Sequence, residues 1–399
     1  MSLPTDPSGD QGLLSPVYAG TITESLTGDD AVVQAMLRSE AALLGALAGC
    51  GIAPPECAAA AGQVNALEVD TRALSLAAVA GGNPVIPLVA LLRSAVPPEV
   101  APWVHHGATS QDIMDTALML VAADACLRAE ADLTTVAEFL AALCERTRSV
   151  PVVARTLTQQ ALPTTLGMRA AGWLAGVHDA VRALRRCTSL PGLLPASLGG
   201  PVGTASTYGA QGPAVLDAYA AGVGLGSPVA SWHVRRTPVV DLVAALMLTG
   251  DACAKIAADL LVMGQTEVAE AREGSGGASS SMAHKSNPVG SVLVVAAGRQ
   301  IAPLVAVVAS SGFPEQERPA GAWHAEWASL RQVLRLAGGA AERAAGYLPE
   351  VVLDTDAMAR NLRMLQAALG EDDAWVTAHV EHTGIWIDRV LAQHREVFS

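Results

Sequence analysis

Lysine is almost absent from this chain of 399 residues, which contains only Lys255 and Lys285. The formal net charge is −13, so the chain lacks the basic surface that nucleic acids and anionic membranes require of a partner. The N-terminal stretch also lacks the basic and apolar segments of a secretory signal. The longest apolar runs, residues 289–298 and 301–312, are too short to span a bilayer. We therefore expect a cytoplasmic protein that binds neither nucleic acid nor membrane.

No two of the cysteines form a CxxC pair, so the usual spacing of a zinc site or a redox motif is missing. They are scattered, mostly through sequence with helical character, which is typical of buried free thiols in a reducing compartment. We therefore predict neither a metal nor a cofactor. The cysteines are Cys50, Cys57, Cys126, Cys144, Cys187 and Cys253.

Strand-like alternation is missing as well, whereas apolar residues recur at helical spacing over long stretches. Several predicted helices have about 25 to 35 residues, against a usual 11 to 12. They are apolar on most sides, so a single chain offers too little surface to bury them. We predict an all-α fold, an elongated long-helix bundle that completes its core in an obligate oligomer. The predicted helices cover residues 29–48, a short region between 55 and 81, and 87–95, 111–148, 163–186, 238–271, 288–310, 325–347 and 373–394.

The most unusual stretch, residues 274–288, reads GSGGASSSMAHKSNP. Its glycines and serines lie between two long apolar stretches and exclude a place in the core. A flexible linker rarely ends in such an ordered mixture of Met, His, Lys, Asn and Pro. We predict a mobile loop that closes over a ligand, with Lys285 inside it.

A polar cluster, residues 105–112 (HHGATSQD), precedes the longest predicted helix. Thr109 and Ser110 lie where the first helix amides are free, so the site suits an anion. The alternative is that the cluster only caps the helix, with Asp112 or Asp115 as the capping side chain.

Three further clusters each leave two interpretations open. Residues 155–165 (RTLTQQALPTT) either bind substrate or only begin the next helix. Residues 232–237 (WHVRRT) contain two arginines that either bind carboxylates or lie at the surface. Residues 315–327 end in an aromatic–His–acid patch, WHAEW, which either contacts a ligand or packs around a buried histidine.

Together these clusters supply Thr, Ser, Asn, Gln, Lys, Arg and His, but no nucleophilic cysteine, no P-loop and no metal triad. Such a set suits an acidic substrate held by hydrogen bonds and a few cations, and proton transfer next to a carboxylate. Removing that proton builds negative charge on the carboxylate. Lys285, Asn287 and loop amides are the candidate donors that would stabilise this charge.

Three of the stretches together resemble the fumarase/aspartase superfamily. SSSMAHKSNP (residues 279–288) is similar to its signature loop, while HHGATSQDIMDT and RTLTQQALPTTLG resemble its first and second shared regions, in the expected order. The likeness extends from about residue 18 to residue 369. Through GNPVIPLV (82–89) and ERPAGAWHAEW (317–327), the chain most resembles the 3-carboxy-cis,cis-muconate cycloisomerase branch.

The resemblance implies a homotetramer with a shared central helical bundle, active sites assembled from three subunits, and a small dicarboxylate substrate. We divide the chain into an N-terminal helical domain (1–110), a central long-helix domain (111–350) and a C-terminal helical domain (351–399) that is shortened relative to the superfamily.

The same resemblance implies roles for individual residues. The general base falls on Ser279, whose hydroxyl needs help from loop amides and from Lys285 to lose its proton. His105 is our candidate for a general acid, with His106, His284 and His324 as alternatives. The predicted substrate-binding residues are Thr109, Ser110, Gln159, Arg236, Lys285, Asn287 and Asn83.

The chain departs from the superfamily pattern in its signature loop, where Ala278, Ala283 and Ser286 replace the usual Gly, Pro and Arg. The second region also lacks the histidine that would fall on Leu157 or Gln160, and with it the usual general acid. A leaving group that is stable as an anion needs no acid. The missing histidine therefore favours a lyase that expels such an anion, for example nitrite from nitrosuccinate, and releases fumarate.

Two alternatives to this lyase are left. The overall likeness favours a 3-carboxy-cis,cis-muconate cycloisomerase, in which the substrate's own carboxylate adds and leaves. A structural scaffold that has lost catalysis is disfavoured because Ser279, Lys285, Asn287, Thr109 and Ser110 are all present.

Overall fold

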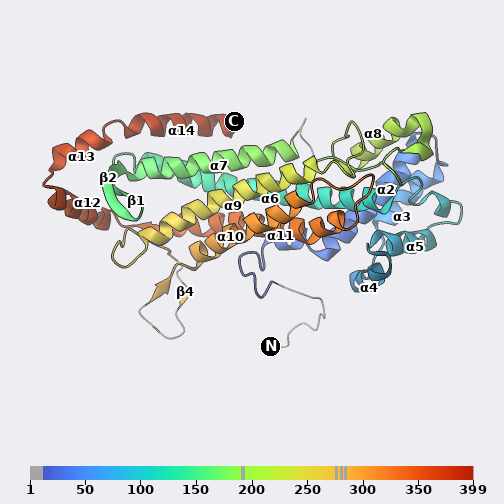
Figure 1. Cartoon of the computed structure of the whole chain (residues 1–399), viewed down its shortest axis with the longest axis horizontal. Helices are drawn as coiled ribbons and strands as arrows, with labels where there is room; N and C mark the ends of the chain where they lie inside the picture. The colour runs from blue at the N-terminus through green and yellow to red at the C-terminus, as the bar shows by residue number, and fades with distance from the viewer. Residues whose placement is uncertain (1–11, 190–193, 275–276, 279–281, 283–284, 399) are drawn as a thin grey trace.

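The computed structural model describes residues 12–189, 194–274, 277–278, 282 and 285–398, and it is an elongated bundle of helices (Figure 1). The longest helices run side by side along the bundle, as the spacing of apolar residues predicts. Helix α9 packs against α7, α10 and α11, and α6 packs against α2, α7 and α11. These long helices are α6 (Ser110–Arg146), α7 (Leu166–Thr188), α9 (Thr237–Met263), α10 (Val289–Ser310) and α11 (Ala322–Tyr347).

Shorter helices gather at the end of the bundle where α6 begins (Figure 1). Helix α2 forms the largest part of this group, and its residues Leu37, Leu43, Leu44 and Leu47 are completely buried. The group comprises α2 (Asp29–Gly49), α3 (Glu56–Asn65), α4 (Thr71–Gly81), α5 (Val85–Ala95), η1 (Ala101–Trp103), η2 (Ser206–Gln211) and α8 (Gly212–Val223). The short helix α1 (Ile22–Leu26) packs against α6 and α11.

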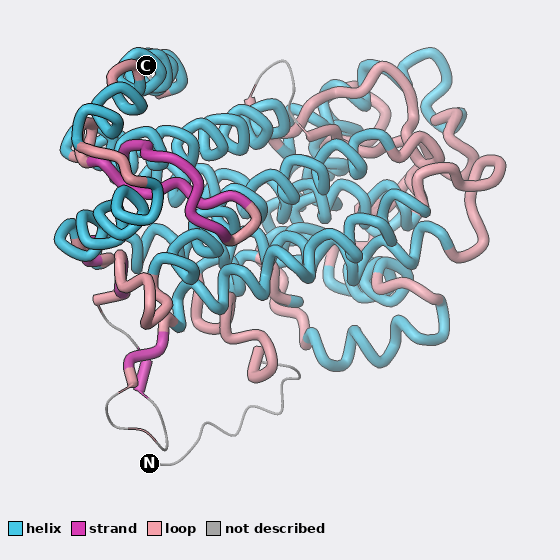
Figure 2. Tube along the Cα trace, turned by 60° about the vertical axis from the view of Figure 1, so that its left-hand side comes forward, coloured by secondary structure: helices cyan, strands magenta, loops and turns pink. Residues whose placement is uncertain are grey.

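The C-terminal helices lie at the opposite end, next to a β-hairpin (Figure 2). Val153 of the hairpin packs with Leu362, Leu365 and Val376 in a small cluster separate from the main core. These elements are β1 (Pro151–Thr156), β2 (Gln159–Thr165), η3 (Leu348–Glu350), α12 (Thr355–Leu369), α13 (Asp373–Val380) and α14 (Thr383–Val397).

The hairpin corrects the expectation that the chain has no strands. Residues 163–165, expected to open a helix, belong to β2, and α7 begins only at Leu166. Thr165 is its N-cap, since its side chain accepts a hydrogen bond from the Met168 N–H. Two further short pairs join β3 (Ala271–Arg272) to β6 (Val352–Leu353), and β4 (Gly277–Ala278) to β5 (Ser286–Asn287).

One predicted helix is shorter than expected, and another is divided into two. The helix predicted over 238–271 ends at Met263, and the predicted helix 373–394 is divided into α13 and α14. Helices α8 and α12 were not predicted from the sequence. After the last residue of α9 the chain turns at Gly264. The Met263 carbonyl accepts a hydrogen bond from the Glu270 N–H, and so the chain folds back here.

Helix α10 differs from the rest of the bundle because most of its apolar surface is exposed within one chain. By length and composition alone, α2 and α10 are the two helices among the described residues that could cross a membrane; 67% of the α2 window is buried in the core, but only 22% of the α10 window. Val289, Val292 and Val307 are among the exposed side chains of α10.

The six cysteines are free, as expected, and all of them except Cys50 are buried. The tetramer, the three-domain division and the cytoplasmic location stay predictions.

Candidate active site

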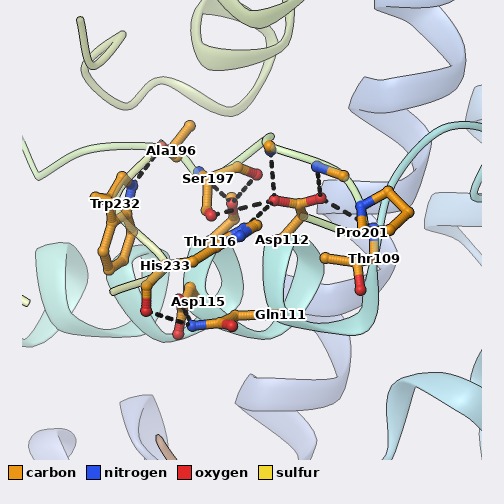
Figure 3. A network of polar contacts seen from close by, with 12 residues as sticks. Thr109, Gln111, Asp112, Asp115, Thr116, Ala196, Ser197, Pro201, Trp232 and His233 are labelled. Atoms are coloured by element: carbon orange, nitrogen blue, oxygen red, sulfur yellow. Dashed lines mark hydrogen bonds and ion pairs between the residues drawn. The ribbon is translucent and has the colours of Figure 1, made fainter. Parts of the chain in front are cut away.

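Asp112 is the centre of a buried network at the N-terminus of α6 (Figure 3). Its side chain is completely buried, and it accepts a hydrogen bond of 2.9 Å from the N–H of Thr109, the N-cap residue. It also accepts from the N–H groups of Gly199 (2.7 Å) and Gly200 (2.9 Å), and lies 2.6 Å from His233 Nε2. The predicted capping role of Asp112 is therefore confirmed, and the same carboxylate joins the loop 197–203 to the start of α6.

A second buried network lies one helical turn further along α6. Arg236 is 3% exposed, and it donates to Asp115 (2.7 Å) and to Glu326 (2.6 Å). Burial works to lower the pKa of Arg236, but the two carboxylates raise it above its ordinary value, so the guanidinium stays charged. Burial raises the pKa of Glu326, against the opposing effect of Arg236. Trp323 completes the network by donating to Asp115 at 2.9 Å.

This network bears on two of the open interpretations. The Nε, Nη1 and Nη2 atoms of Arg236 all donate to carboxylates of the chain itself. Substrate binding by Arg236 therefore stays a prediction that this geometry does not favour. Arg236 is not at the surface, whereas Arg235 is exposed. In the WHAEW patch, Trp323 and Glu326 are buried and contact Asp115 and Arg236, respectively. His324 is exposed instead of buried.

Arg318 is a candidate site residue that the sequence analysis did not single out. Its side chain is exposed, and it donates to Thr109 Oγ1 at 2.9 Å and to the Pro201 carbonyl at 3.2 Å. A guanidinium therefore lies directly beside the predicted Thr109–Ser110 pair, where it can bind a carboxylate. The only signal in the sequence was its place in the ERPAGAWHAEW stretch.

His105 lies in the loop that leads into α6 and contacts a buried acid. Its Nδ1 is 2.6 Å from Oε1 of Glu40 on α2, and Glu40 is completely buried. The predicted binding residue Asn83 is also buried, and its side-chain amide forms hydrogen bonds with the backbone of the turn before α5. Its Nδ2 donates to the Gly81 carbonyl at 3.3 Å, and its Oδ1 accepts from the Val85 N–H at 3.1 Å.

At the opposite end of α6, the β1–β2 hairpin presents the second polar cluster. The tip is built from Leu157 and Thr158, which have φ angles of +47° and +67° and join the strands in a two-residue turn. Positive φ is unusual for residues with bulky side chains, so the tip is strained. Leu157 is 95% exposed, and the neighbouring Gln159 is exposed too.

Glu270 holds this hairpin against the rest of the chain. It is completely buried and accepts two hydrogen bonds from Arg155 of β1, at 2.7 and 3.0 Å. Asn361 of α12 donates to it at 2.7 Å, and Arg169 of α7 lies 3.9 Å away. Burial lowers the pKa of Arg169, and Glu270 counteracts this effect.

The short strands β4 and β5, on either side of residues 279–285 of the signature loop, lie at the same end of the bundle as the hairpin (Figure 1). Asn287 of β5 pairs with Gly277 and lines a cavity of about 120 Å³ together with Glu273 and Ser291. Glu273 caps α10, because its carboxylate accepts from the N–H groups of Gly290 (3.0 Å) and Ser291 (2.8 Å). Lys285 is exposed. The predicted base Ser279 and the alternative acid His284 lie outside the described residues.

One chain therefore separates the predicted site residues into two groups. Helix α6 has 37 residues, so its ends are about 55 Å apart at 1.5 Å per residue. One group lies near its N-terminus and comprises His105, Thr109, Ser110, Asn83 and Arg236. The other belongs to elements toward its C-terminus (Figure 1) and comprises Gln159 on β2, Asn287 on β5 and Lys285 directly before β5.

Among the residues that the structure describes, no group of three or more His, Cys, Asp or Glu side chains is arranged to hold a metal ion. That the reaction needs neither metal nor cofactor stays a prediction. The side chains that are present can bind carboxylates through Arg318, Thr109 and Lys285, and can exchange a proton through His105.

Comparison with known proteins identifies the family of this chain. The family model Lyase_1, described as lyase, matches residues 57–302. The chain is 42% identical to nitrosuccinate lyase from Streptomyces davaonensis over 368 residues, covering 88% of this chain and 77% of that protein. It is 37% identical to 3-carboxy-cis,cis-muconate cycloisomerase from Bradyrhizobium diazoefficiens over 360 residues, covering 88% and 79%.

A solved structure, that of the 3-carboxy-cis,cis-muconate lactonizing enzyme from Pseudomonas putida, has a TM-score of 0.88 and 29% sequence identity to this chain. The match covers 97% of this chain and 100% of that one. The sequence resemblance is therefore confirmed, and the chain belongs to the lyase family of the fumarase/aspartase superfamily.

Proposed function

We propose that this protein is a lyase that removes a proton next to a carboxylate and expels nitrite from nitrosuccinate, with release of fumarate. The observation that carries this proposal is the hairpin tip. It presents Leu157, Gln159 and Gln160 where an acid-bearing member of the superfamily would have a histidine. Nitrite leaves as a stable anion and needs no proton, so a tip without an acid is sufficient for this reaction. The 42% identity to a nitrosuccinate lyase supports the same conclusion.

In the proposed reaction, Ser279 takes a proton from the carbon next to one substrate carboxylate. The electrons of that C–H bond are delocalised onto the carboxylate, where Lys285 and Asn287 would stabilise the added charge. They then form the C=C bond of fumarate while the C–N bond breaks and nitrite departs with its electron pair. Arg318 and Thr109, which are joined by a hydrogen bond of 2.9 Å, would bind the second carboxylate.

This reaction needs both groups of residues in one site, so we propose a homotetramer whose sites are shared between subunits. Within a chain the two groups lie toward opposite ends of α6, whose 37 residues span about 55 Å, and no local movement closes such a separation. The exposed apolar surface of α10 supports the same assembly, because a helix of this composition is normally buried. A second copy of the chain would bury it.

Turnover assays test the reaction. The purified chain is offered nitrosuccinate, other 2-substituted succinates, and 3-carboxy-cis,cis-muconate, while nitrite, fumarate and lactone are measured. We expect equal amounts of nitrite and fumarate from nitrosuccinate. Lactone from the muconate, with no fumarate from any succinate, would overturn the proposal. Ser279→Ala should abolish turnover and leave the oligomer unchanged in light scattering.

Mixing two inactive variants tests the shared site. Ser279→Ala alters the signature loop, and Thr109→Val alters the first group. If each site takes residues from different subunits, hybrid tetramers formed after reversible dissociation should regain part of the activity. If each chain forms its own site, no hybrid regains activity, and the shared-site proposal is wrong.

The cycloisomerase alternative is supported by a specific observation, the TM-score of 0.88 to a lactonizing enzyme over nearly the whole of both chains. In that reaction a carboxylate of the substrate adds to a double bond and closes a lactone. The same assay separates the two reactions, because the cycloisomerase forms an isomer and releases neither nitrite nor fumarate.

A further inference from the structure

The loop before α6 holds His105 in a conformation that needs support from its surroundings. His105 has a φ of +61°, in the left-handed region that favours glycine. Tyr208 donates to the His106 carbonyl at 2.8 Å, and Gly107 packs so closely on the Tyr208 ring that a Cβ there would lie 2.6 Å from it. A strained residue persists only where its neighbours impose the conformation, and strain of this kind is concentrated at functional sites.

Glu40 contacts the imidazole ring of the same histidine, His105. It projects from α2 into the core at complete burial, and its Oε1 is 2.6 Å from His105 Nδ1. Its second oxygen, Oε2, is buried and has no hydrogen-bond partner among the described residues. Glu40 lies on the same face of α2 as Leu37, Leu44 and Leu47, where an apolar side chain would be the expected choice.

Burying a carboxylate costs several kcal/mol of desolvation unless partners compensate for it. The one described side-chain partner of Glu40 is His105, which is itself 15% exposed and so reaches from the core to the surface. Two buried tyrosines nearby, Tyr208 and Tyr219, have pKa values raised by burial, and the charges of Asp112 and Glu40 raise them further, so both stay neutral. The contact with His105 explains why a glutamate occupies this buried position in spite of its desolvation cost.

We propose that Glu40 is a positioning residue for His105: it holds the proton on Nδ1 and leaves Nε2 as the ring nitrogen that faces the substrate. A carboxylate only accepts hydrogen bonds, so its contact with Nδ1 requires a proton there. Nε2 is then an acceptor in the neutral ring and a donor in the charged ring. This inference rests on the proposed function for the substrate, but the position of the proton is independent of any reaction.

The position of the proton is measured directly by NMR. The full-length protein is labelled with ¹⁵N-histidine, and His105 is assigned by loss of its signals in His105→Asn. We expect Nδ1 to carry the proton in the wild type, and Glu40→Leu to shift the ring to the Nε2–H form. An unprotonated Nδ1 in the wild type would overturn the proposal, because Glu40 would then be the donor.

Kinetics test whether the contact matters for turnover. With His105 present, we expect Glu40→Gln to lower kcat/KM at least about tenfold, the effect of one hydrogen bond to a charged group. In the His105→Asn background the same substitution should change kcat/KM less than about twofold, because Glu40 acts through the histidine. Equal losses in both backgrounds would mean that Glu40 only supports the fold, and would overturn the positioning role.

Ser39→Ala is the matched control. Ser39 is the neighbouring residue on α2, it is also completely buried, and its hydroxyl bonds within the helix to the Ala35 carbonyl at 2.8 Å. It should leave both the ring proton and kcat/KM unchanged. A wild-type chain that fails to turn over nitrosuccinate would contradict the proposed function, while the NMR result would still support or overturn the role of Glu40.

Discussion

The two ends of α6 are each organised by one completely buried carboxylate, but the carboxylates have different partners. Asp112 accepts mainly from backbone N–H groups of Thr109, Gly199 and Gly200, with His233 as an additional contact. Glu270 is surrounded by side chains, with Arg155 and Asn361 bonded to it and Arg169 at 3.9 Å.

The two carboxylates differ in the groups that donate to them, which are backbone N–H groups at Asp112 and side chains at Glu270. Backbone donors have fixed directions, so Asp112 joins two loops at one geometry, next to Thr109 and Arg318. The arginines at Glu270 are long side chains that also neutralise its charge, so the hairpin is held through side chains and not through backbone groups. We therefore expect the Asp112 end to contribute more to stability, and the Glu270 end to govern how far the hairpin tip reaches.

The largest expected effect is at Asp112. Asp112→Ala leaves several buried donors without an acceptor and should lower the free energy of unfolding by about 3 to 5 kcal/mol. Urea unfolding measures the loss, and hydrogen exchange should locate it at residues 197–200. Asp124→Ala, an exposed acid on the same helix, is the control, and we expect a change within about 0.5 kcal/mol there.

The next effect is at Glu270. Glu270→Gln keeps the shape but leaves Arg155 and Arg169 beside a neutral amide, so unfolding should become easier by about 2 to 3 kcal/mol. The control is Glu267→Gln, three residues earlier and exposed. If Glu270→Gln destabilises the chain more than Asp112→Ala does, the ranking of the two ends is wrong.

A smaller effect, of opposite sign, is expected at the hairpin tip. Replacing Leu157 and Thr158 by Asn and Gly supplies residues suited to positive φ and should stabilise the chain by about 1 kcal/mol. Turnover should nevertheless fall if the tip reaches into a site. Leu162→Asn, a half-exposed position on β2, controls for the loss of apolar surface. An unchanged kcat/KM in the tip variant would remove the hairpin from the proposed site.

The smallest effect concerns a third buried cluster, where imidazoles take the place of carboxylates. His178 of α7 contacts His394 of α14 at 3.2 Å, and Gln393, Arg182 and Asp179 also face it. Burial lowers the pKa of His178 below its ordinary 6.5, and the unfolded chain therefore binds the proton first as the pH falls.

The stability from this cluster is present above about pH 6.5 and is lost as the pH falls toward the lower pKa of the folded state. Burial lowers the pKa of His394 as well, so the two rings act in the same direction. The protection of residues 383–397 against hydrogen exchange, relative to the intrinsic exchange rate at each pH, should fall between pH 7.5 and 5.5, and His178→Phe should remove most of that dependence. Protection that does not change with pH would show that the rings do not control the docking of α14.

The extent of the long helices could be read from the sequence, because helix length depends on local hydrogen bonds and on apolar periodicity. The helix expected over 111–148 is found as Ser110–Arg146, and that expected over 29–48 as Asp29–Gly49. The β1–β2 hairpin was missed because both faces of its tip are exposed, so the strands show little alternation between apolar and polar residues.

The contacts of individual polar residues were less accessible to sequence analysis. Arg236 was predicted to bind substrate, but Asp115 and Glu326 occupy its donors. Glu40 had a weak signal, since it is an acid on the apolar face of α2, and Arg318 had none beyond its neighbourhood. In each case the partner lies far away along the chain, and only the packing of helices decides which side chains meet.

By itself, the sequence determined the helical class of this protein, its superfamily and its inventory of carboxylate-binding and proton-exchanging side chains. These properties follow from local periodicity and from short motifs that need no knowledge of distant contacts. The tertiary structure alone decided that the two groups of site residues lie toward opposite ends of α6, because α6 is one unbroken helix of 37 residues between them. It also decided that buried carboxylates hold His105 and the hairpin in place, since through-space contacts leave no local pattern in the chain.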